Sequence, residues 1–287
     1  MKKFLLLSAM FVFAAACSRE SAPADAATEA GSENSAPSAT AELIAMDCGR
    51  ITMMDLSLFA SDGEYDGREN MAADMCFFVR HADGDLMWDA GLPDALNANE
   101  DGVTNGPFHL SVPVTVASQL DAAGVAPADI EYFSISHSHF DHVGNAAMFA
   151  GSTFLIDKDE RAFMFRSGAR EDAESFALIA PLEDAETTEF DGDHDVFGDG
   201  SVVILDMPGH TPGHKSLLVK TVSETYLLTG DLYHLEEARE KRTIPQFNSD
   251  AEQTLASMDR FEALAEEHGA RVIIQHSLDD MKALMGE

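Results

Sequence analysis

Short apolar runs alternate with helical patterns along most of the chain from residue 45 onward. Runs rich in β-branched and aromatic residues predict strands, and apolar residues three or four positions apart predict helices. The predicted strands cover residues 75–81, 86–89, 130–135, 154–157, 202–205, 215–222, 225–228 and 271–274. The predicted helices cover residues 113–123, most of 158–179, 250–268 and 279–285. This order of elements predicts one layered α/β domain with a single core.

The first residues follow a different pattern. Lys2 and Lys3 precede an apolar run at residues 4–16. The run is shorter than the roughly 20 residues that span a bilayer, so residues 1–16 are predicted to be a signal peptide. Residues 17–42 are rich in Ala, Ser, Glu and Pro and contain no aromatic residue, which predicts a flexible tether. The folded domain is therefore expected at residues 43–287.

The segment that ends at Cys17 resembles a bacterial lipobox, because three alanines precede the cysteine. This resemblance implies a lipid anchor on Cys17, and Ser18 after it implies an outer-membrane lipoprotein that faces the periplasm or the surface. Plain cleavage after Ala16, which would leave a soluble periplasmic protein, is the alternative. Apart from this anchor, no contact with a membrane is expected.

Acidic residues far outnumber basic ones, with 51 Asp plus Glu against 18 Lys plus Arg and a net charge of −33. Such a chain lacks the clustered cations that bind nucleic acid, and nucleic-acid partners are excluded. The chain has three cysteines and no CxxC pair, so a metal site must be built from His and Asp. Cys48 and Cys76 lie on predicted neighbouring strands and form either a disulfide or two buried thiols.

The richest chemistry follows the predicted strand 130–135. Three histidines and one aspartate lie within six residues there, at His137, His139, Asp141 and His142. Imidazole and carboxylate groups around one point suit Zn²⁺ and related divalent ions. Nothing in the structure of a surface loop requires this composition. The segment therefore predicts a metal site.

Three more donors follow apolar runs farther along the chain, namely His210, Asp231 and His276. Open α/β sheets gather their site residues at the ends of strands, so these donors are expected to converge with the first four. One metal would take His137, His139 and His210. A second metal would take Asp141, His142 and His276, and Asp231 would bridge the two ions.

The seven donors, in this order, resemble the signature of the metallo-β-lactamase superfamily. The resemblance covers the chain from about residue 45 and implies an αββα four-layer sandwich with two metal ions at one edge. Asp89, in a Trp-Asp-Ala-Gly turn, matches the superfamily aspartate that supports a metal ligand from behind. The ions implied are two divalent cations, with Zn²⁺ expected and Mn²⁺, Co²⁺ or Fe as alternatives.

Within the superfamily, the segments 136–144, 208–217 and 248–276 resemble N-acyl-homoserine lactonases. This resemblance implies a quorum-quenching enzyme that opens acyl lactones with an activated water. By the same resemblance, true β-lactamases lack an aspartate at the position of Asp231, so this residue argues against that branch. The acidic composition argues against the nuclease and glutathione-linked branches. A phosphotriesterase or aryl-esterase on the same site, or a metal-binding lipoprotein that has lost catalysis, are the alternatives. A small acyl lactone or ester is the expected substrate, and a dimer is compatible with the sequence.

The resembling lactonases use a tyrosine to polarise the lactone carbonyl, and this chain has no tyrosine between Tyr132 and Tyr226. Tyr233, His234 and Tyr65 are the candidates to replace it. Asp141 is expected to carry a proton to the leaving alkoxide. For His234, direct support of a ligand and a place in the pocket wall are equally compatible with the sequence.

Other residues have structural interpretations. His214 resembles a superfamily histidine that begins a strand and is not a ligand, and four further histidines are expected to be solvated or structural: His81, His109, His194 and His268. An early apolar segment is expected to serve mainly as core, with an acyl pocket as the alternative; it comprises Met53, Met54, Leu56, Leu58 and Phe59. The loop from Ser61 through Asn70 and Met71 is a candidate flap over the site.

Overall fold

The computed structural model describes residues 41–286. The predicted signal peptide, Cys17 and nearly all of the predicted tether lie outside the described residues. The fold begins two residues earlier than expected, because Ala41 forms a β-bridge with Thr221 and the first strand already includes Glu42. Glu42 therefore belongs to the domain and not to the tether.

The described chain contains thirteen strands, seven α-helices and seven short 3-10 helices. The strands are β1 Glu42–Met53, β2 Asn70–His81, β3 Gly84–Trp88, β4 Val103–Asn105, β5 Phe108–Ser111, β6 Tyr132–Ser134, β7 Thr153–Asp157, β8 Thr187–Phe190, β9 His194–Asp195, β10 Val202–Asp206, β11 Lys215–Lys220, β12 Thr225–Leu228 and β13 Arg271–Ile273. The α-helices are α1 Val116–Ala122, α2 Phe140–Val143, α3 Lys158–Met164, α4 Ala173–Ile179, α5 Glu236–Lys241, α6 Ala251–His268 and α7 Leu278–Met285. The 3-10 helices are η1 Leu56–Phe59, η2 Asp94–Ala98, η3 Pro127–Asp129, η4 Ala146–Phe149, η5 Ser167–Glu171, η6 Ala180–Leu182 and η7 Gly230–Leu232.

The strands form two mixed sheets. The first has the order β4-β5-β1-β2-β3-β6-β7-β8, and the second has the order β13-β12-β11-β10-β9. In the first sheet, β6 runs parallel to both β3 and β7, and in the second sheet β13 runs parallel to β12. The segments that follow β6 and β13 therefore emerge at carboxyl ends of parallel strands, where site residues gather.

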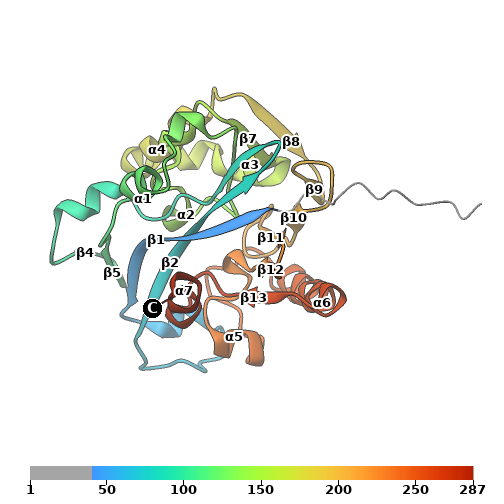
Figure 1. Cartoon of the computed structure of the whole chain (residues 1–287). Coiled ribbons are helices and arrows are strands. Elements are labelled where there is room, and N and C mark those ends of the chain that lie inside the picture. The colour runs from blue at the N-terminus through green and yellow to red at the C-terminus, as the bar shows by residue number, and fades with distance from the viewer. Residues whose placement is uncertain (1–40, 287) are drawn as a thin grey trace, which may run out of the picture. The chain divides into compact units, whose positions relative to one another are not determined.

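The side chains of the strands separate into layers, as the alternation of strand residues requires. Phe77 packs between the two sheets with Ile204 and Leu217. Its neighbour Phe78 points to the opposite face of the first sheet and packs in a cluster with helices α1 to α4. Helix α6 covers the outer face of the second sheet through residues such as Phe261. Figure 1 shows α1 to α4 on one side and α6 on the other, which confirms the expected order of helix, sheet, sheet and helix.

Some elements differ from the sequence-based expectation. Helix α1 begins at Val116 and not at residue 113, because the Thr115 side chain accepts a hydrogen bond from the Ser118 N–H and caps the helix there. The strands β4, β5, β8 and β9 were not predicted, since their residues are largely exposed or half-buried. No described helix is both long and apolar enough to cross a membrane.

Cys48 and Cys76 form a disulfide that joins β1 to β2. Both side chains are fully buried. Of the two interpretations that the sequence allowed, a disulfide or two buried thiols, the structure has the disulfide.

Candidate metal centre

The seven predicted donors come together from both sheets. The segment after β6 carries His137 and His139 and continues into α2, which holds Asp141 and His142. The other three donors follow strands of the second sheet: His210 after β10, Asp231 in η7 after β12, and His276 after β13. The seven donors therefore converge from both sheets, as their placement after strands predicted.

Three histidine nitrogens converge on one point. His137 Nε2 lies 2.9 Å from His139 Nδ1, and His210 Nε2 lies 3.2 Å from the first and 3.1 Å from the second. Nitrogen ligands at the usual distance from a tetrahedral Zn²⁺ lie roughly 3.3 Å apart. Burial lowers the pKa of His137, His139 and His210, so these rings are held neutral. Neutral imidazoles with facing nitrogens fit a divalent cation, and these three residues are called the first ligand group.

Asp141, His142 and His276 form a second ligand group, whose donor atoms also lie within 4.8 Å of one another. His276 Nε2 lies 3.9 Å from Asp141 Oδ2. Although burial opposes protonation, Asp231 raises the pKa of His276 to about 9. Asp231 and Asp89 likewise raise the pKa of His142 against the effect of burial. A cation that binds this group must therefore displace protons.

Asp231 faces both groups, one carboxylate oxygen to each. Its Oδ2 lies 3.5 Å from Nε2 of both His137 and His210, and its Oδ1 lies 2.9 Å from His276 Nε2 and 3.2 Å from His142 Nε2. Although burial opposes ionisation, the surrounding histidines hold the pKa of Asp231 well below its usual range. This carboxylate has the position that a bridge between two cations requires.

Residues behind the donors fix their rings. Asp89 Oδ2 accepts a hydrogen bond from His142 Nδ1 at 2.9 Å and another from Gln275 Nε2 at 2.6 Å, and its Oδ1 accepts one from the Ser136 N–H at 2.6 Å. His276 Nδ1 donates to the Ala73 carbonyl at 2.8 Å. These bonds leave each Nε2 directed toward the centre. The supporting position predicted for Asp89 is confirmed, and the part played by Gln275 was not foreseen.

His214 is not in either ligand group. Its Nδ1 donates to the Met207 carbonyl at 2.9 Å, and its Nε2 accepts the Asp231 N–H at 2.9 Å. Burial lowers its pKa to about 4, so the ring is neutral. His214 therefore holds the backbone of the bridging aspartate in place, in agreement with the expectation that it is not a ligand.

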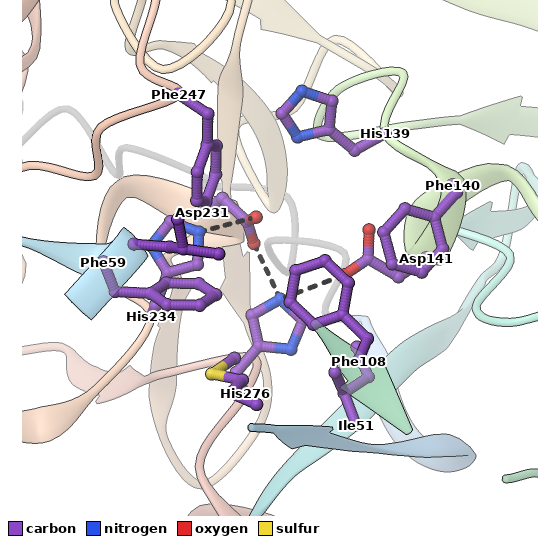
Figure 2. A pocket seen from close by; sticks show the side chains of 12 residues that line it. Ile51, Phe59, Phe108, His139, Phe140, Asp141, Asp231, His234, Phe247 and His276 are labelled. Carbon is purple, nitrogen blue, oxygen red and sulfur yellow. Dashed lines mark hydrogen bonds and ion pairs between the residues drawn. The ribbon is translucent and has the colours of Figure 1, made fainter. Parts of the chain in front are cut away.

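A cavity of about 360 Å³ opens beside the donors. Its polar end is formed by His139, Asp141, Asp231, His234 and His276. Figure 2 shows the ion pairs that join Asp231 to His234 and to His276, and His276 to Asp141. Its remaining wall is apolar and consists of Ile51, Met53, Leu58, Phe59, Phe108, Phe140 and Phe247. The site can therefore hold a molecule with one polar, reactive end and one apolar end.

The early apolar segment, residues 53–59, contributes both to the cavity wall and to the core. Met53, Leu58 and Phe59 line the cavity, whereas Leu56 is fully buried in the adjoining core and Met54 is exposed. Phe108, Phe140 and Phe247 were missed as wall residues. Of these, only Phe140 had a signal in the sequence, because it lies inside the HxHxDH segment.

The prediction of a catalytic Tyr233 is contradicted by the geometry. Its hydroxyl donates to Glu262 Oε1 at 3.0 Å, and its ring packs on Phe261 under α6. Tyr65 is also turned away from the cavity, because its hydroxyl hydrogen-bonds with Thr243 Oγ1 at 3.1 Å. Neither tyrosine lines the cavity.

His234 does lie at the site and combines both expected roles. Its ring lines the cavity, and its Nε2 lies 3.0 Å from Asp231 Oδ2. The Nε2 atom has no hydrogen bond of good geometry among the described residues. His234 is thus the candidate that the structure retains to contact a substrate.

The segment expected to form a flap over the site, from Ser61 to Met71, is only partly a loop. Asn70 and Met71 belong to strand β2 and line a second, more polar hollow that also reaches His234 and His276. The loop before them is fixed to the chain after α5, where the Ser61 N–H donates to the Ile244 carbonyl at 2.9 Å. Of the other histidines, His81 and His194 stack on phenylalanines and His109 bonds with Thr104, away from the cavity.

Comparison with known proteins agrees with this geometry. The family model described as Metallo-beta-lactamase superfamily matches residues 74–276. The chain is 28% identical over 216 residues to the N-acyl homoserine lactonase AttM of Rhizobium radiobacter, covering 71% of this chain and 81% of that protein. It is 27% identical over 212 residues to an N-acyl homoserine lactonase of a Bacillus species, covering 71% and 81%.

Solved structures share the fold. An N-acyl homoserine lactone hydrolase with N-hexanoyl-L-homoserine at its catalytic metal centre superposes with a TM-score of 0.70 at 23% identity, covering 86% of this chain and 96% of that chain. AidC, described as a dizinc quorum-quenching lactonase, superposes with a TM-score of 0.60 at 17% identity, covering 82% and 87%. At this level of identity the likeness establishes the fold.

Proposed function

The chain belongs to the metallo-beta-lactamase superfamily, and we propose that it is a metal-dependent hydrolase that opens the lactone ring of N-acyl homoserine lactones. The observation that carries the proposal is the cavity, because its polar end is made by metal-type donors and its other wall is apolar. An N-acyl homoserine lactone likewise has a polar end, the lactone ring, and an apolar end, the acyl tail. The lactonases among the chain's relatives support this choice.

The first and second ligand groups would hold two divalent cations, with Asp231 between them. Zn²⁺ is the proposed ion because His and carboxylate donors suit it, and Mn²⁺, Co²⁺ or Fe would also fit. Bound here, the cations would supply an activated water and polarise the ester carbonyl.

The chain's own residues have three tasks in this proposal. The phenylalanine-rich wall binds the acyl tail and excludes water from it. His234 orients the carbonyl end, because its Nε2 is buried at the cavity wall and has no well-aligned hydrogen bond among the described residues. Asp141 lines the cavity and carries a proton to the leaving alkoxide oxygen.

We also propose that residues 1–16 export the chain and that Cys17 anchors it by a lipid. The lipobox-like segment before Cys17 supports this placement. Globomycin treatment of expressing cells tests it, since a lipidated chain would accumulate as the unprocessed form. Normal processing in its presence would contradict the anchor.

A substrate panel tests the proposed activity. The Zn²⁺-loaded full chain is assayed against N-butanoyl and N-decanoyl homoserine lactones, a paraoxon-type triester, an aryl ester and nitrocefin, with D231N as the inactive control. We expect the highest kcat/KM on the lactones. A higher kcat/KM on the triester, the aryl ester or nitrocefin than on every lactone would overturn the proposal.

A further inference from the structure

Glu160 is a buried carboxylate that takes no part in either ligand group. It lies in the first turn of α3, and only 1% of its surface is exposed. Four hydrogen bonds reach it from outside its own helix. A buried ionisable group with so many partners is costly to desolvate, so its partners indicate what it does.

The two oxygens of Glu160 hold two different loops. Oε1 accepts hydrogen bonds from the Ser138 N–H at 2.8 Å and the Ser138 hydroxyl at 2.6 Å. Oε2 accepts hydrogen bonds from the Thr211 hydroxyl at 2.6 Å and the Gly213 N–H at 3.2 Å. Ser138 lies between His137 and His139, and Thr211 directly follows His210. One carboxylate therefore joins the two loops that carry the first ligand group.

The histidine rings of the first ligand group make fewer supporting hydrogen bonds than those of the second group. In the second group, Asp89 fixes His142 and the Ala73 carbonyl fixes His276. In the first group, the His210 Nδ1 is buried and has no hydrogen-bond partner among the described residues. A ring without such a partner depends on its backbone for orientation. The loop that carries His210 is held by Glu160.

Glu160 is itself rigidly placed. The Asp157 side chain caps α3 by accepting the Asp159 N–H at 2.7 Å, and it also pairs with the buried Lys215 Nζ at 2.7 Å. Gly213 lies so close to the helix that a Cβ on it would come within 2.3 Å of the Glu160 nitrogen. The loop after His210 is therefore pressed directly against the first turn of α3.

We propose that Glu160 is a positioning residue for the first metal site, where it sets the separation and orientation of His137 and His139 relative to His210. The proposal rests on the metal binding in the proposed function. It predicts a selective defect: loss of the Glu160 carboxylate weakens cation binding by the first ligand group and leaves the second group nearly unchanged. A residue that only stabilises the fold would affect both groups alike.

The test measures Co²⁺ affinity in variants of the full chain that retain one ligand group each. H276A retains the first group and H210A retains the second. E160Q is introduced into each background, because glutamine keeps the volume but turns one acceptor oxygen into an NH₂ that faces donors. Co²⁺ affinity is measured by competition with a chromogenic chelator. E262Q is the matched control, since Glu262 also accepts several side-chain hydrogen bonds but contacts neither loop.

In the H276A background, E160Q should weaken Co²⁺ binding by about 10- to 100-fold, the usual effect of removing a group that supports a metal ligand. In the H210A background, E160Q should change the affinity little, and E262Q should change it little in both. Equal weakening in the two backgrounds, or no weakening in the first, would overturn the proposal.

A second variant keeps the test decisive if E160Q does not fold, as judged by near-ultraviolet circular dichroism. T211V removes one donor to Glu160 at nearly constant volume and should give a smaller defect with the same selectivity. Unselective or absent weakening in T211V would then overturn the proposal. Because the readout is metal affinity, failure of the wild-type protein to open lactones would refute the proposed activity and not this role of Glu160.

Discussion

Asp231 is the residue on which the centre depends most, because each of its oxygens faces a different ligand group. Its backbone is fixed by His214 and its charge is stabilised by the surrounding histidines.

The backbone conformation after Asp231 determines which of two adjacent side chains, Tyr233 or His234, reaches the cavity. Tyr233 has an extended conformation, with φ −138° and ψ 122°. Adjacent side chains on extended backbone point in opposite directions, so Tyr233 enters the core and His234 enters the cavity.

Asn in place of Asp141 tests the proton-transfer role. The amide keeps an oxygen donor for the second ligand group but cannot accept and release a proton near neutral pH. We expect D141N to retain most of its metal and to lose about 10²- to 10⁴-fold in kcat, the usual contribution of a general acid or base. Metal content and kcat are measured on the same preparation. Wild-type kcat in D141N would contradict the role.

The buried His214 predicts a loss of stability in acid. Its pKa is about 4 in the folded protein, against about 6.5 for an unperturbed histidine. Below pH 6.5 the unfolded chain takes up a proton that the folded chain refuses, so the free energy of unfolding falls as the pH drops toward 4. At pH 4.5 this loss amounts to about 2 kcal/mol.

H214Q removes that titration while keeping a donor and an acceptor. In metal-free protein, urea unfolding at pH 7 and pH 4.5 should therefore show a smaller loss of stability for H214Q than for the wild type. The same loss in both proteins would mean that His214 does not contribute to the acid response.

At the scale of elements, the disulfide fixes the strands that support the centre from behind. Cys76 lies on β2 near Asp74, whose carboxylate accepts the Leu92 N–H at 2.8 Å, and Cys48 lies on β1, where its carbonyl accepts the same N–H at 3.2 Å. Leu92 follows the turn that carries Asp89. The disulfide therefore connects the long β1–β2 pair to that turn.

The double variant C48A/C76A tests this contribution. The bridge spans 28 residues along the chain, and removal of a native disulfide of this kind costs about 2–4 kcal/mol. Urea unfolding without reductant should show this loss, and the wild type unfolded with reductant should match the variant. Equal unfolding midpoints for the variant and the oxidised wild type would contradict the stabilising role.

The elements also show what a sequence can and cannot predict. The helix α6 was predicted almost to the residue because its Asp250 cap and its apolar spacing are local features. The strand β5 could not be predicted, since it is stabilised by pairing with β1, which lies far away in the chain. Phe108 on β5 was missed as a cavity residue for the same reason.

At the scale of the whole domain, the seven donors could be found because each follows a strand, and strand ends meet at one edge of the sheets. The cavity wall could not be found in this way. Phe59, Phe108 and Phe247 come from three distant segments, and they meet only when η1, β5 and the segment before α6 pack together. Glu160 was missed because a single glutamate in a helix gives no signal of its own in a chain with 51 acidic residues.

The whole chain has a net charge of −33. Two divalent cations at the centre would offset only a small part of it, so the surface stays strongly acidic. Such a surface disfavours anionic substrates and leaves neutral, diffusible ones unaffected. Uncharged acyl lactones fit this condition.

Lactone opening measured against added metal tests whether the chain is a lactonase that needs two metal ions. The metal-free chain is titrated with Zn²⁺, and the rate of N-decanoyl homoserine lactone opening is followed at each step. We expect the rate to rise until two equivalents of Zn²⁺ per chain are bound and then to stay constant. Full activity at one equivalent, or no lactone opening with two bound, would contradict this expectation.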